Sequence, residues 1–143
     1  DQKYKYIALL QPTSPLRTAQ HIDESVEQLG DSEAIVSVVK TEHPIEWSNT
    51  LQTNNSMDDF IDDSTRNKRS QDLPIRYRIN GAIYIAKTEK LVLEKTFQLR
   101  KGAVAYKMDS SSSVDIDESQ DFVLALINQI GLNKALNKLN DIQ

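Results

Sequence analysis

Two aspartates two residues apart, Asp115 and Asp117, have the best spacing in this sequence for holding a metal ion. In an extended segment, residues i and i+2 project to the same side, so both carboxylates would face one way, with the neighbouring apolar residues buried behind them. Adjacent carboxylates repel unless a cation lies between them, and their hard oxygen atoms suit magnesium that arrives with phosphates. The alternative is a helix start, with Asp117 or Ser119 capping a helix that begins near Gln120.

A second polar group lies in the stretch QPTSPLR, residues 11–17, which directly follows an apolar run. In open α/β sheets, ligands bind beyond the carboxyl ends of the strands. The prolines stiffen the turn, while Gln11, Ser14 and Arg17 offer amide, hydroxyl and guanidinium groups for a polyhydroxylated or anionic ligand. The alternative is an ordinary strand-to-helix connection, in which Thr18 caps the helix and Arg17 is solvated.

A third group is RYRING, residues 76–81, where two arginines and an asparagine lead into a strand through a glycine. Arg76 and Arg78 could form a fork for a carboxylate or a phosphate. Gly81, at the start of the strand, would allow a ligand to approach the backbone closely. The alternative is a charged loop edge.

Strand and helix patterns alternate around these groups. The apolar patterns predict strands over 5–10, 34–39, 81–86 and 104–108, and helices over 18–29, from near Thr88, over 119–130 and over 132–140. The unbroken apolar run at 5–10 predicts a strand covered on both faces. This alternation predicts an α/β fold with a largely parallel sheet.

Between residues 41 and 74 the pattern dissolves into scattered apolar residues among polar and charged ones. So long a loop is unusual inside a compact domain.

Composition narrows the class of protein. The 143 residues are 38% hydrophobic and 27% charged, which fits one soluble globular domain. The net charge of -4 is no electrostatic reason to expect a nucleic acid or an anionic membrane as partner. There is no apolar run long enough to span a bilayer, no apolar leader and no cysteine, so we expect a cytoplasmic protein.

Three blocks of this sequence resemble signature segments of the N-acylneuraminate cytidylyltransferases, or CMP-sialic acid synthetases. In the same order as in that family, they are YIALLQPTSPLRTAQHIDESV, SQDLPIRYRINGAIYIAK, and AYKM followed by SVDIDESQDF. The resemblance runs from Tyr6 to about Ile130. It implies a three-layer, mostly parallel α/β domain of the nucleotide-diphospho-sugar transferase type. Residues 1–143 would be the C-terminal part of this single domain, incomplete at its N-terminus.

The resemblance also implies a reaction. The anomeric 2-hydroxyl of sialic acid, or of a related nonulosonic acid, attacks the α-phosphate of CTP, and pyrophosphate leaves. The family requires Mg²⁺, and by matching position Asp115 and Asp117 are the metal-binding, catalytic carboxylates. Such chemistry depends mainly on positioning the reactants and neutralising developing charge.

The same matching assigns the sugar site. Arg78 is the expected partner of the substrate carboxylate, and Phe97 matches an aromatic residue that lines the sugar pocket. Ser14 and Arg17 are expected at the substrate because QPTSPLR would form the floor where nucleotide and sugar meet. The remaining sugar-site residues implied by the resemblance are Gln11, Asn80 and Tyr84.

In the family, the region that corresponds to residues 41–74 is an extension that exchanges across a homodimer and lends basic groups, here Arg69, to the neighbouring site. Its sparse apolar residues suit an interface. Ser70 stands where many members have an arginine, and Gln98 replaces a second aromatic residue. These departures leave open whether the sugar is sialic, legionaminic, pseudaminic or another nonulosonic acid.

The glycine- and lysine-rich loop that holds the triphosphate in this family has no counterpart here, since the four glycines are scattered. We therefore expect the isolated chain to be inactive. Two alternatives are a CMP-KDO synthetase, which the Arg78-Ile79-Asn80-Gly81 block argues against, and a non-catalytic sugar-binding or dimerisation module.

Overall fold

A computed structural model describes residues 4–140 as a mixed four-stranded sheet with four α-helices, which confirms the α/β class. The strands are β1 (Tyr6–Leu9), β2 (Ala34–Lys40), β3 (Tyr77–Lys87) and β4 (Ala103–Met108). The helices are α1 (Ala19–Leu29), α2 (Thr88–Glu94), α3 (Ser119–Ile130) and α4 (Leu132–Asn140), with short 3₁₀ helices at η1 (Ile45–Trp47), η2 (Ser70–Asp72) and η3 (Ser110–Ser112). None of the helices described between residues 4 and 140 is long and apolar enough to cross a membrane.

The chain divides into two compact units. Residues up to Val39 and from Ile79 onward form the first unit, and Lys40–Arg78 form the second. The boundaries fall at the end of β2 and inside β3.

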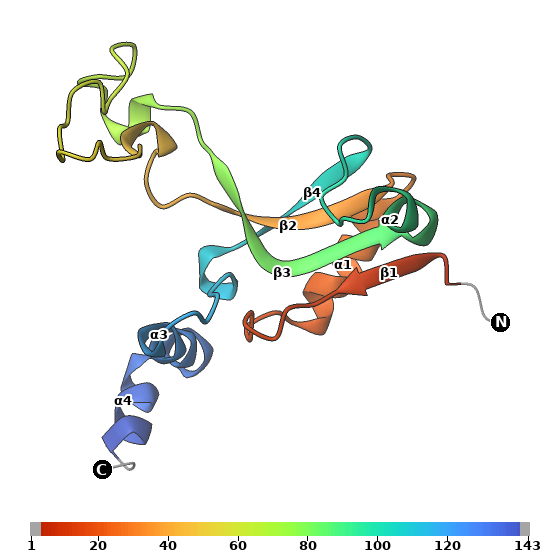
Figure 1. Cartoon of the computed structure of the whole chain (residues 1–143). Helices are drawn as coiled ribbons and strands as arrows, with labels where there is room; N and C mark the ends of the chain where they lie inside the picture. Colours follow the sequence, from red (N-terminus) through yellow and green to blue (C-terminus); the bar gives the residue numbers. More distant parts are fainter. Residues whose placement is uncertain (1–3, 141–143) are drawn as a thin grey trace. The chain divides into compact units, whose positions relative to one another are not determined.

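The strand order is β1-β3-β2-β4 (Figure 1). β1 pairs antiparallel with β3, with Ala8 opposite Ile85, whereas β2 pairs parallel with β4, with Ser37 opposite Tyr106. The sheet is therefore mixed, not largely parallel as predicted. A parallel pair needs a long crossover connection, and the chain between β2 and β4 supplies one that includes β3 and α2.

The first strand differs most from expectation. β1 is an edge strand of the sheet described for residues 4–140, and Ile7 and Leu9 are 37% and 42% exposed there, so these residues do not provide the expected cover on both faces. An apolar run shows that a segment can be buried, but its place in the sheet decides whether it is.

The main core lies where α1 packs on the sheet. Leu29 of α1 clusters with Ile35 of β2, with Ile83 and Ile85 of β3, and with Tyr106 of β4. These residues are distant in sequence, so their burial ties the end of α1 to three strands at once.

The start of α1 confirms a sequence prediction. Thr18 is the N-cap: its Oγ1 accepts a hydrogen bond from the His21 N–H at 3.3 Å, and its own N–H donates to His21 Nδ1 at 3.2 Å. Two amide groups that the helix cannot pair are thereby satisfied, and the helix begins directly after the QPTSPLR loop.

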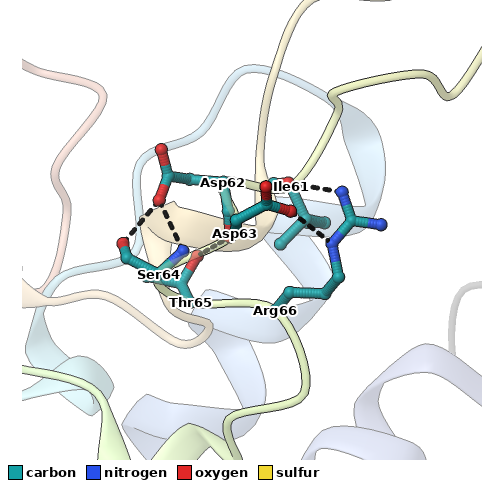
Figure 2. A network of polar contacts seen from close by, with 6 residues as sticks. All are labelled: Ile61, Asp62, Asp63, Ser64, Thr65 and Arg66. Carbon is teal, nitrogen blue, oxygen red and sulfur yellow. Dashed lines mark hydrogen bonds and ion pairs between the residues drawn. The ribbon is translucent and has the colours of Figure 1, made fainter.

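The second unit is held mainly by local polar contacts. Figure 2 shows one network of such contacts. Asp62 Oδ1 accepts hydrogen bonds from the N–H and Oγ of Ser64, at 2.8 and 2.5 Å, and Arg66 Nε donates to Asp63 at 2.9 Å. Among the described residues of this unit, only Leu73 is a buried apolar side chain. The prediction of an irregular segment with a sparse core is confirmed.

We expect Leu29→Ala to destabilise the first unit by about 2–5 kcal/mol, because it leaves a cavity where α1 meets the sheet. Val26 on the same helix is 51% exposed, so Val26→Ala is the matched control and should change stability by less than about 0.5 kcal/mol. Urea unfolding followed by circular dichroism measures both. Equal losses in the two variants would contradict this account of the core.

Candidate functional site

The QPTSPLR loop is tied to β3 by Arg17. Its Nη1 donates to the carbonyl oxygen of Gln11 at 3.0 Å and to that of Ala82 at 2.8 Å. Arg17 is partly buried, so the alternative of a solvated arginine is wrong. Charge-assisted bonds of this kind are stronger than neutral ones, and these two hold the loop against the strand.

Gln11 and Asp115 approach the same point on β3, the α-carbon of Gly81. Gly81 has a φ of +79°, and a Cβ built on it would collide with Oε1 of Gln11 and lie 3.6 Å from Oδ2 of Asp115. Gly81 lies within β3, four residues after its start, so the prediction that it begins the strand is wrong. The missing Cβ leaves room for the side chain of Gln11, whereas the predicted close approach of a ligand stays a prediction.

The Asp115 segment is also bonded to the QPTSPLR loop. The N–H of Ile116 donates to the carbonyl oxygen of Thr13 at 2.8 Å, and Val114 is buried as predicted. Asp115 is partly buried, and its Oδ1 has no hydrogen-bond partner among the described residues. A buried carboxylate oxygen without a partner is costly, so this atom is suited to receive a cation or a donor from a ligand.

Asp117 is exposed, and no hydrogen bond to its carboxylate is present in residues 4–140. The N-cap of α3 is Glu118, and Asp121 Oδ2 accepts from the N–H groups of Asp117 and Glu118 at 3.1 and 2.8 Å. The prediction that Asp117 or Ser119 caps this helix is therefore wrong, and the Asp117 carboxylate is not used for capping. Within the described residues, no group of three or more acidic or histidine side chains could hold a metal ion by itself.

Two predicted sugar-site residues lie together. The rings of Tyr84 and Phe97 meet edge to face, with centroids 6.1 Å apart, and Phe97 also packs beside Leu99. Burial raises the pKa of the Tyr84 hydroxyl, and the charge of Asp115 raises that pKa further.

Two other predicted ligands are buried. Ser14 and Asn80 are each only 1% exposed. Ser14 Oγ has no hydrogen-bond partner among the described residues, whereas Asn80 is bonded to Ser37, which sequence reasoning did not select. The signal was present, because Ser37 is the one hydroxyl residue in the apolar strand AIVSVV.

The remaining predicted residues lie in the second unit. Arg78 is exposed, and Arg69 is paired with Asp72, with Nε at 3.0 Å from Oδ2. Arg76 Nη2 lies 2.8 Å from Oε1 of Glu46, and the fork of Arg76 and Arg78 for an anionic ligand stays a prediction. The guanidinium groups of Arg69 and Arg76 are both exposed, and exposed ion pairs contribute only about 0–1 kcal/mol, so neither arginine is committed to its own carboxylate.

Over most of its length, this chain is similar to cytidylyltransferases. It is 36% identical over 135 residues, 92% of the chain, to the N-acylneuraminate cytidylyltransferase of Escherichia coli O18:K1:H7. It is 35% identical over 117 residues, 80% of the chain, to the enzyme of that name from Streptococcus agalactiae serotype V. The CMP-N,N'-diacetyllegionaminic acid synthase of Legionella pneumophila is 28% identical over 131 residues, 87% of the chain.

The matched region is only a part of each relative. The chain spans 31% of the Escherichia coli protein, 28% of the Streptococcus protein and 53% of the Legionella protein. No family model matches the chain. The relatives named N-acylneuraminate cytidylyltransferase, at 35–36% identity over most of this chain, agree with the resemblance of the three sequence blocks.

Two glycines with similar positive φ values test the contact at Gly81. Gly81 and Gly131 have φ values of +79° and +82°, but a Cβ at Gly131 would meet nothing within 4 Å. We expect Gly81→Ala and Gly131→Ala each to cost about 1–3 kcal/mol from backbone strain. Only Gly81→Ala should displace the Gln11 side chain, seen as a shift of its amide NH₂ signals in NMR spectra. Unchanged Gln11 signals in Gly81→Ala would contradict the close approach.

Proposed function

We propose that the protein containing this chain is a CMP-nonulosonate synthetase, which joins CMP from CTP to sialic acid or a related nonulosonic acid and releases pyrophosphate. The observation that carries the proposal is the meeting of Gln11 and Asp115 at Gly81. These residues come from all three sequence blocks that resemble the cytidylyltransferases, and the relatives carry names of that activity. Residues 1–143 would be the C-terminal part of the catalytic domain.

Asp115 and Asp117 are the proposed ligands of a magnesium ion. Two features support this role: Asp115 Oδ1 is buried without a partner, and the Asp117 carboxylate is free of the helix cap. When bound, the ion would neutralise charge on the CTP phosphates. Since the described chain offers no third acidic or histidine ligand nearby, phosphate oxygens and water would complete its coordination.

The neutral groups around Gly81 are proposed to hold the sugar. Gln11 presents an amide whose carbonyl oxygen already faces the strand, and the Tyr84–Phe97 pair offers an apolar wall with one hydroxyl. Arg78, which is exposed and precedes Gly81 by three residues in β3, is the proposed partner of the sugar carboxylate. The relatives are named for different sugars, N-acylneuraminate and diacetyllegionaminic acid, so the proposed substrate is a nonulosonic acid as a class.

The second unit is the proposed dimer interface. Its apolar side chains are largely exposed: Ile45 by 50%, Trp47 by 39%, Leu51 and Met57 by 59% each. Phe60 is partly buried. An apolar surface on a segment with so small a core of its own suits a symmetric contact with a second copy, across which Arg69 would reach the neighbouring site.

The activity test uses the protein at its natural length with CTP, Mg²⁺ and N-acetylneuraminic or legionaminic acid. We expect CMP-sugar and pyrophosphate, and no turnover by residues 1–143 alone, which lack a glycine-rich loop for the triphosphate. Asp115→Asn and Asp117→Asn should each lower kcat about 100-fold or more, since an amide keeps the shape but weakens the hold on the ion.

Asp121→Asn is the control for that experiment, because it removes a nearby carboxylate but keeps an acceptor for the N–H groups of Asp117 and Glu118. It should leave kcat close to that of the unmodified protein. Near-normal turnover by both Asp115→Asn and Asp117→Asn at saturating magnesium would remove the metal role from this pair. Clear turnover by residues 1–143 alone would refute the proposal that they need a separate triphosphate loop.

The dimer is tested by sedimentation of the natural-length protein. We expect a two-fold dimer, and Trp47→Ser should raise its dissociation constant about 10-fold or more if the indole is buried at the contact. Leu93 of α2 is 74% exposed and lies in the first unit, so Leu93→Ser is the control and should not weaken the dimer. A monomer at high micromolar concentration would refute the interface.

A further inference from the structure

The side-chain amide of Asn80 is completely surrounded by protein. Its Oδ1 accepts hydrogen bonds from Ser37 Oγ at 2.6 Å and from the N–H of Ala82 at 3.2 Å. Its Nδ2 donates to Ser113 Oγ at 2.9 Å and lies 3.4 Å from the sulfur of Met108. With 1% of the residue exposed, the hydrogen-bonding capacity of this amide is directed to its own chain.

The orientation of this amide is determined by its partners. The N–H of Ala82 can only donate, so the atom that it meets must be the carbonyl oxygen of Asn80. The NH₂ group must then point the other way, toward Ser113. Ser37 supports this arrangement from β2, because its Oγ also accepts the N–H of Ile83 at 2.7 Å.

The two ends of the amide reach the two sides of the candidate site. On the oxygen side, Ala82 directly follows Gly81, where Gln11 approaches the strand. On the nitrogen side, Ser113 lies two residues before Asp115, and its Oγ donates onward to the carbonyl oxygen of Asp109 at 2.8 Å. The Asn80 amide thus links Ala82 in β3 to Ser113, in the segment that carries the Asp115 carboxylate.

We propose that Asn80 is a positioning residue, which acts through Ala82 and Ser113 to set the place of the Asp115 carboxylate relative to Gly81, and that it does not touch the sugar. To contact a ligand, the buried amide would have to give up one of its hydrogen bonds and leave a polar group unpaired. Residues that support a metal ligand without touching the metal commonly determine the orientation of that ligand. The activity part of this inference rests on the proposed cytidylyltransferase function.

Ser113→Ala, made in the natural-length protein, is the central variant, because it removes the link toward Asp115 but leaves Asn80 bonded to Ser37 and Ala82. Ser110→Ala, an exposed serine in the same 3₁₀ turn, is the matched control. We expect Ser113→Ala to lower kcat about 10- to 100-fold while the KM for the sugar changes by less than about 3-fold. Asn80→Ala should behave in the same way, and the double variant should be no worse than the poorer single variant.

Hydrogen exchange supplies a readout that does not need activity. In Ser113→Ala, amide exchange should accelerate across residues 113–117, and in Asn80→Ala also at Ala82, whereas Ser110→Ala should match the unmodified protein. A sugar KM raised 10-fold or more by Asn80→Ala, with Ser113→Ala resembling Ser110→Ala, would overturn the inference and make Asn80 a ligand. A natural-length protein without CTP-dependent turnover would refute the proposed function alone. Unchanged exchange over 113–117 in Ser113→Ala would then refute the positioning role.

Discussion

The geometry of the candidate site depends on a single residue with a positive φ, Gly81, which lies inside the longest strand, β3. A side chain at this position would occupy the space that Oε1 of Gln11 fills, and it would crowd Asp115. The backbone bend also turns the N–H of Ala82 toward the amide of Asn80. Because residues 80–86 of β3 are buried, the bend cannot relax without disturbing the core, and a change at one point would reach the loop, the strand and the carboxylate together.

The loops around Gly81 are joined to each other and to the sheet by few but strong contacts. Arg17 ties the loop after β1 to the carbonyl oxygen of Ala82, and the Ile116–Thr13 backbone bond ties the Asp115 segment to that same loop. Residues from three distant parts of the sequence are thus held in place before any ligand binds. Preorganisation of this kind suits the proposed nucleotidyl transfer, because positioning and charge neutralisation supply most of the rate in such reactions.

The second unit is held together by contacts of a different kind. Its contacts are mostly short in sequence, such as the turn around Asp62 and the pair of Arg69 with Asp72, and its apolar side chains remain exposed around a core that holds little more than Leu73. Local polar bonds can shape a segment, but they stabilise it weakly, because exposed ion pairs contribute about 0–1 kcal/mol each. Such a unit gains most of its stability when a second surface covers its apolar residues. For this reason we propose it as the interface of a dimer.

The sequence by itself determined the local elements. The helix over 119–130, the cap at Thr18 and the irregular segment before β3 follow from periodicity and capping, which involve residues a few positions apart. Only the tertiary structure decided that β1 lies at the edge of the described sheet, that Arg17 bonds to backbone carbonyl groups, and that Asn80 is enclosed with Ser37 as its partner. Each of these outcomes depends on a residue 43 or more positions away, or on a strand's place in the sheet. Residue type and spacing identify which groups can do chemistry, but long-range packing decides which of them face a ligand and which hold the others in place.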